Sequence, residues 1–136
     1  MTKYLTSYLL VLVIFTVIDM VWLMGVARST YVAEMGALMK KSPNLAAAVI
    51  FYLLYAAGLV VFAVKPGLQN ESWLWASLLG AGLGLIAYGT YDFTNLAVIE
   101  GYGWRIAIID LVWGTTVSAV TAALATRLAI AFSLNG

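Results

Sequence analysis

Four long apolar stretches occupy most of the chain, and they constrain its fold more than any other feature. They cover about residues 4–26, 45–64, 73–99 and 104–130. The hydrocarbon core of a bilayer is about 30 Å thick, so a helix that crosses it needs about 20 apolar residues. Unpaired backbone groups in lipid cost several kcal/mol each, and the alternating pattern of membrane strands is absent. We therefore expect an all-α protein with four transmembrane helices.

The composition excludes several other classes of protein. Of the 136 residues, 64% are hydrophobic and 10% are charged, whereas a soluble domain is roughly half apolar and about a quarter charged. These values exclude a soluble globular fold and intrinsic disorder. The formal net charge of +1 argues against a nucleic-acid partner. Because the sequence has no cysteine and no histidine, we expect neither a metal nor a cofactor.

Polar turn signals separate the apolar stretches. The segments 42–44, 65–67 and 100–103 are rich in proline, glycine and polar residues, and Ser72 is placed to cap the third helix. Short connections make neighbouring helices antiparallel, so we expect one transmembrane domain over residues 1–136, an up-down-up-down four-helix bundle.

The connection of residues 27–41 is longer than the others. Tyr31, Met35 and Leu38 follow helical spacing, while Arg28 and Glu34 fall on other faces. This pattern predicts a short amphipathic helix in the headgroup layer between the first two spans. The alternative is an ordinary polar loop. The basic residues divide almost evenly between the two sides, so they do not set the orientation of the protein in the membrane.

Three aspartates lie inside the predicted spans. A carboxylate at depth costs about 2.5–3.5 kcal/mol on insertion scales, so it normally faces the bundle interior or a wet cavity. Asp19 is late in the first helix, Asp92 is late in the third, and Asp110 is early in the fourth. In an up-down-up-down bundle these positions share one half of the membrane. We therefore expect the three carboxylates to meet in one layer.

Polar and aromatic side chains surround this layer. Tyr88, Tyr91, Asp92 and Asn95 fall on one face of the third helix at helical spacing. We expect a pocket with a polar floor of Asp19, Asp92, Asn95 and Asp110, and with walls of Tyr52, Tyr55, Tyr88, Tyr91, Trp22 and Trp113.

Small residues continue this face of the third helix further into the span. Gly80 and Gly84 form a Gly-x-x-x-Gly pair, which lets another helix approach closely. We expect this face to be available for a homo-oligomer or for a larger membrane complex.

Four strings of residues together resemble a known family. They are Asp19-x-x-Trp22-Leu23, Phe51-Tyr52-Leu53-Leu54-Tyr55-x-x-Gly58, Tyr91-Asp92-x-Thr94-Asn95-Leu96 and Asp110-x-x-Trp113-Gly114-Thr115. The sequence is similar to the small bacterial four-span membrane proteins classed as domain of unknown function 2177. The resemblance covers nearly the whole chain and implies a multi-pass protein of the bacterial inner membrane. It implies no reaction.

The residues themselves favour a membrane-embedded pocket that binds, and in one version also modifies, a lipid or another hydrophobic small molecule. Membrane lipid is then the expected partner. Two other functions stay open. In the first, the protein is an accessory or structural subunit of a larger complex, and the aspartates only hold the bundle together. In the second, it is a small proton-coupled transporter.

Overall fold

The computed structural model describes residues 2–135 and is all-α, with no strand in that range. The first three elements are α1 (Thr2–Val21), the π-helical turn η1 (Trp22–Val26) and α2 (Arg28–Met35). The second apolar stretch forms α3 (Leu45–Leu59), the π-helical turn η2 (Val60–Val64) and α4 (Lys65–Gln69). The chain ends in two long helices, α5 (Trp73–Val98) and α6 (Trp104–Asn135).

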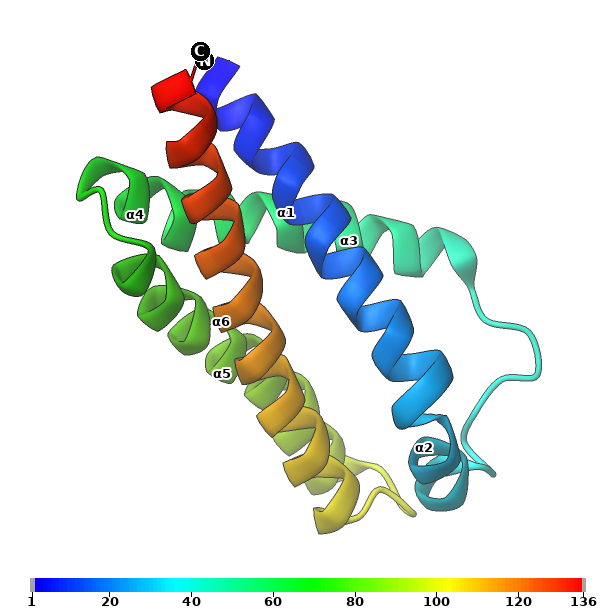
Figure 1. The fold of residues 1–136 in the computed structure, drawn as a ribbon. Helices are drawn as coiled ribbons and strands as arrows, with labels where there is room; N and C mark the ends of the chain where they lie inside the picture. The colour runs from blue at the N-terminus through cyan, green and yellow to red at the C-terminus, as the bar shows by residue number, and fades with distance from the viewer. Residues whose placement is uncertain (1, 136) are drawn as a thin grey trace.

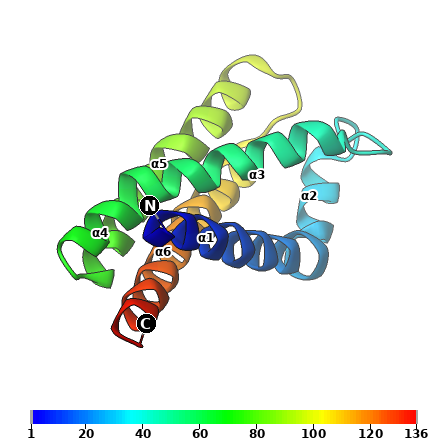
Figure 2. The same ribbon diagram turned by 90° about the horizontal axis from the view of Figure 1, so that it is seen from above.

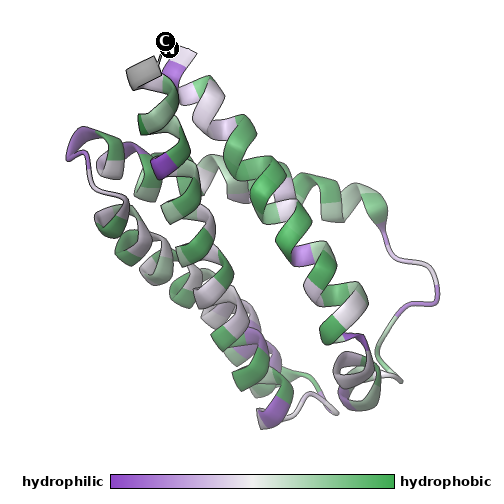
Figure 3. Cartoon of the chain, in the orientation of Figure 1, coloured by the Kyte–Doolittle hydropathy of each residue, from purple (hydrophilic) through white to green (hydrophobic). Residues whose placement is uncertain are grey.

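Four helical segments are long and apolar enough to cross a membrane, as predicted. They are Thr2–Val26, Leu45–Gln69, Trp73–Val98 and Trp104–Ser133. Two of them begin at side-chain caps. The Asn44 Oδ1 accepts a hydrogen bond from the Ala47 N–H at 3.1 Å, and the Ser72 Oγ accepts one from the Trp75 N–H at 3.0 Å. Hydrophobic residues make up most of the length of the spans, while hydrophilic residues are more frequent at helix ends and connections (Figure 3).

Helices α5 and α6 form the tightest pair in the molecule, and they run side by side in Figure 1. A Cβ atom added at Gly80 would lie 2.7 Å from the Ser118 carbonyl oxygen, and one added at Gly84 would collide with the Gly114 carbonyl oxygen. Both glycines are buried against α6. These small residues thus serve contact within the chain, and a homo-oligomer or a larger membrane complex stays a prediction.

Helix α3 departs from a regular bundle because it runs across α1 and α6 instead of alongside them (Figures 1 and 2). Its second half is buried at Tyr55, Ala56 and Leu59, where it joins a core with Val11 of α1 and Val117 of α6. Its first half is exposed, with Leu45 at 70%. The residues of α3 that precede Tyr52 are thus largely exposed.

The connection between the first two spans contains the predicted helix, although α2 ends at Met35 and the segment from there to Asn44 is irregular. The chain leaves α1 through η1, where the Ala27 N–H donates to the Trp22 carbonyl oxygen at 2.8 Å. This five-residue spacing is that of a π-helix, a turn found most often at functional sites. In the view of Figure 1, α2 lies below the end of α1 and to the right of the lower ends of α5 and α6.

Candidate functional site

Asp19 is held by donors from two other helices. Its Oδ2 accepts a hydrogen bond from the Tyr52 hydroxyl of α3 at 2.5 Å, and its Oδ1 accepts one from the Trp113 Nε1 of α6 at 2.9 Å. The aspartate is 7% exposed. Each carboxylate oxygen therefore has a donor, as a buried carboxylate requires. The contacts tie α1, α3 and α6 together at one depth.

A stacked tryptophan pair connects Asp19 to the next aspartate. The rings of Trp22 and Trp113 are parallel within 4°, with centroids 4.3 Å apart. The Trp22 Nε1 donates to the Tyr31 hydroxyl at 3.3 Å, and that hydroxyl donates to the Asp110 Oδ1 at 2.7 Å. Tyr31 lies on α2, so this interfacial helix is attached to α6 by a charge-assisted hydrogen bond.

Asp92 completes the layer. It is fully buried, and its Oδ1 accepts a hydrogen bond from the Tyr102 hydroxyl at 2.6 Å. Its Oδ2 is buried without a partner.

We call the eight residues of these contacts the polar network. Six are connected in one chain of contacts: Tyr52, Asp19, Trp113, Trp22, Tyr31 and Asp110. The other two, Asp92 and Tyr102, form a hydrogen-bonded pair. The structure thus brings the three predicted aspartates into one layer. It pairs them with tyrosines and tryptophans, and over the described residues no group of three or more acidic side chains converges so as to hold a metal ion.

Two tyrosines of the network lie outside the spans, and the pKa of each is raised above the ordinary value of a tyrosine hydroxyl. Burial raises the pKa of Tyr31, and the nearby Asp110 carboxylate adds to that effect. Burial also raises the pKa of Tyr102, with a further contribution from its hydrogen bond to Asp92. Both hydroxyls therefore act as stable hydrogen-bond donors at neutral pH.

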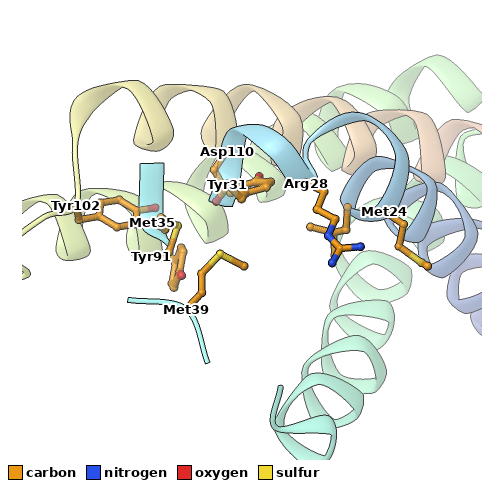
Figure 4. Close-up of a pocket in the computed structure, with 9 residues that line it drawn as sticks. Met24, Arg28, Tyr31, Met35, Met39, Tyr91, Tyr102 and Asp110 are labelled. Atoms are coloured by element: carbon orange, nitrogen blue, oxygen red, sulfur yellow. The ribbon is translucent and has the colours of Figure 1, made fainter. Parts of the chain in front are cut away.

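A cavity of about 460 Å³ opens beside the network at the level of α2. We call it the interfacial cavity. Figure 4 shows Tyr102 and Arg28 at opposite ends of it, with Tyr31 and Asp110 between them. Leu23, Met24, Met35, Met39 and Tyr91 complete the lining. The wall thus combines a cation, a carboxylate and three hydroxyls with flexible apolar side chains.

A second cavity, of about 410 Å³, lies deeper, between α3 and α5. We call it the lateral cavity. Its lining is Phe51, Ala87, Tyr88, Tyr91 and Asp110. Asp110 and Tyr91 line both cavities, so the two adjoin at these residues. On the α3 side the lateral cavity is bounded by Phe51, which is exposed.

The other predicted site residues have different surroundings. Tyr55 is in the core, with its hydroxyl 2.6 Å from the Ser118 Oγ. The ring of Tyr88 packs onto Gly114, where a Cβ atom would overlap it. Asn95 is half-buried on the same face of α5 as Tyr91. Asp19 and Tyr52 belong to the network but, in the described part of the chain, line neither of the two cavities.

Three functional candidates do not appear among the site residues predicted from the sequence. Tyr31 is on the apolar face of the predicted interfacial helix, and Tyr102 is flanked by glycines in a turn. Arg28 is the basic residue that begins α2. An alternating Gly-Tyr-Gly turn next to a span with a buried aspartate was the available signal for Tyr102. Nothing in the local sequence indicated that Tyr31 reaches Asp110.

Comparison with known families agrees with this architecture. The family model described as "Predicted membrane protein (DUF2177)" matches residues 4–127. The chain belongs to this family. No curated protein and no solved structure matches it. The match includes the second and third spans, most of the first and fourth, and every residue of the polar network. It supports a multi-pass membrane protein without assigning an activity.

Proposed function

We propose that the protein binds an amphiphilic molecule, a lipid or a similar hydrophobic compound, in the two adjoining cavities. The observation that carries this proposal is the sharing of Asp110 and Tyr91 between a polar cavity at the interfacial level and an apolar cavity at the level of the spans. A binding site for a small molecule is usually a largely apolar hollow with a few polar groups that fix orientation. An amphiphile fits both parts at once.

The different contacts of Asp19 and Asp110 within the polar network support the same proposal. Both oxygens of Asp19 are occupied by donors of the protein, so this aspartate fixes the helices. Asp110 uses one oxygen for Tyr31 and borders both cavities. A carboxylate has about four acceptor positions, so Asp110 retains capacity for a ligand.

The route into the cavities also suits a molecule that arrives from the bilayer. The first half of α3 is exposed, and Phe51 and Tyr91 at the rim of the lateral cavity are 42% and 52% exposed. An apolar tail can therefore pass between α3 and α5 without crossing water. We assign the protein to the bacterial inner membrane on the resemblance given above.

The test is retention of a bound amphiphile by protein purified in a mild detergent. Native mass spectrometry and lipid extraction are carried out on the wild-type chain and on Ala87→Phe, which fills the lateral cavity. Ala97→Phe is the matched control, because Ala97 lies exposed on the same helix. We expect one specific amphiphile on the wild type and on the control, and its loss in Ala87→Phe.

A second variant guards against misfolding of Ala87→Phe. Tyr91 borders both cavities and is half exposed, so Tyr91→Ala changes the site with little cost to the core. Melting temperature is measured for each variant. The proposal is overturned if the wild type carries no specific amphiphile, or if folded Ala87→Phe and Tyr91→Ala retain it as the wild type does.

A further inference from the structure

The polar groups of the two cavities follow an order along the membrane normal. Phe51, Ala87 and Tyr88 line the apolar part within the spans. Asp110 is six residues into α6, which is about 9 Å from the start of that helix. Arg28 begins α2, beyond the end of the first span. A ligand with its tail in the lateral cavity therefore meets a carboxylate first and a cation last.

The group that faces Asp110 has to donate a hydrogen bond. Tyr31 donates to one oxygen of this carboxylate and Asp110 borders both cavities, whereas the unpartnered Asp92 Oδ2 is fully buried and borders neither. Neither aspartate has a cation within salt-bridge distance among the described residues. A ligand anion at this position would be repelled, whereas a hydroxyl or amine would use the free acceptor positions.

The group that faces Arg28 has to be an anion. Arg28 is exposed at the mouth of the interfacial cavity, and its side chain forms no ion pair within residues 2–135. Arg105, on the same side of the membrane, differs because it lies 3.7 Å from the Glu34 carboxylate. A guanidinium binds phosphate or carboxylate oxygens in a two-pronged geometry.

We infer that the bound amphiphile has a hydroxyl or amine next to its apolar tail and a terminal anionic group, as in a single-chain glycerol phosphate lipid. This inference rests on the proposed function and adds the headgroup chemistry. The order of groups selects against a single-chain alkyl phosphoethanolamine, whose phosphate directly follows the tail and whose amine is terminal. Such a headgroup would place its phosphate beside Asp110 and its amine beside Arg28, like charge against like charge at both positions.

The experiment measures the binding of three single-chain probes to delipidated protein by native mass spectrometry. Oleoyl glycerol phosphate has both groups, oleyl phosphate lacks the hydroxyl, and oleoyl glycerol lacks the phosphate. We expect oleoyl glycerol phosphate to bind at least about tenfold more tightly than either of the others, since each lost contact is a charge-assisted hydrogen bond. Glycerol phosphate without a tail should not compete at the same concentrations.

Two variants assign each preference to one residue. In Arg28→Gln, oleoyl glycerol phosphate should bind no more than about twofold more tightly than oleoyl glycerol, and it should still bind more tightly than oleyl phosphate. In Asp110→Asn, oleoyl glycerol phosphate should bind no more than about twofold more tightly than oleyl phosphate. Lys41→Gln is the control for general charge, because Lys41 is an exposed cation of the same connection and lines neither cavity.

The outcomes separate this inference from the proposed function. Equal binding of the three probes overturns the inference, as does a preference unchanged by Arg28→Gln and Asp110→Asn. If the probes bind equally and Ala87→Phe still abolishes binding, only the headgroup assignment is lost. If no probe binds and the purified wild-type protein also carries no amphiphile, both proposals are wrong.

Discussion

The two ends of the molecule are held together in different ways. At one end, η2, α5 and α6 meet through small apolar residues such as Ala63, Ala76 and Ala122, all fully buried. At the other end, α1, α2, α5 and α6 meet through the polar network and leave two cavities. Close backbone contact thus provides a rigid support at one end, and directional hydrogen bonds position side chains around open space at the other.

The largest expected effect comes from the close-packed end. In Gly84→Ala the new methyl group collides with the Gly114 carbonyl oxygen and with Ser118, so α5 and α6 have to move apart. We expect a loss of about 2–3 kcal/mol in the free energy of unfolding, measured by denaturation in mixed micelles. Gly82→Ala is the control, because a methyl group there meets nothing within 4 Å. It should stabilise α5 slightly, and equal effects of the two substitutions would contradict the packing described.

Removal of the Asp19 carboxylate tests the other end. Asp19→Ala leaves the Tyr52 hydroxyl and the Trp113 Nε1 without their acceptor. We expect a loss of about 1–2 kcal/mol, since an unpaired buried donor costs more than a hydrogen bond contributes. Glu100→Ala, at an exposed acid in a turn, should change the melting temperature little. If the two variants behave alike, the Asp19 contacts do not stabilise the bundle.

Tyr31→Phe should have a smaller and more local effect. It removes the hydrogen bond that attaches α2 to Asp110, a contact of about 0.6 kcal/mol in an average membrane protein. We expect faster hydrogen–deuterium exchange in residues 28–35 with little change in global stability. Unchanged exchange in this segment would show that α2 is held by other contacts.

The pH dependence of α2 attachment follows from the same hydroxyl. Burial raises the pKa of Tyr31 above its ordinary value of about 10. The folded protein then keeps a proton that the unfolded chain releases, so this contribution is complete below about pH 10 and is lost as the pH rises further. Exchange in residues 28–35 should increase above that pH in the wild type. In Tyr31→Phe the increase should be weaker, with the remainder attributable to Tyr102.

The smallest expected effect is at the ion pair between Glu34 and Arg105. The two groups are 3.7 Å apart, and the Arg105 side chain is 74% exposed. Exposed pairs of this kind contribute about 0–1 kcal/mol. We expect Glu34→Gln to speed hydrogen–deuterium exchange in residues 28–35 by less than Tyr31→Phe does. A larger increase in exchange would mean that this pair, and not Tyr31, fixes α2.

The helices and the depth of the aspartates could be predicted from the sequence, whereas the partners of the aspartates could not. Length and apolarity determine the spans, and the antiparallel order brings Asp19, Asp92 and Asp110 to one layer. The choice of Tyr31 and Tyr102 as donors depends on how α2 and the turn after α5 fold back. That geometry is tertiary and leaves no periodic signal.

The Gly80–Gly84 pair illustrates the same difference. Its spacing correctly indicates close helix contact, but spacing alone does not distinguish a helix of the same chain from one of a partner. The contacts with Gly114 and Ser118 show that the two glycines pack against α6 of the same chain. Likewise, the oblique course of α3 follows from where its second half packs, and an apolar run has no residue pattern that encodes such an angle.

The π-helical turn at Trp22–Val26 restricts how many residues can separate Trp22 from Tyr31. In an unbroken α-helix, Trp22 and Tyr31 would point to opposite sides and stand about 13 Å apart along the axis, yet here their side chains are 3.3 Å apart. The chain changes direction at Ala27, between η1 and α2, so that α2 runs across the end of the first span (Figure 2). The number of residues between the two aromatics is therefore as restricted as their identity. Deleting a single residue there would rotate α2 and break the hydrogen bond between Tyr31 and Asp110 of α6.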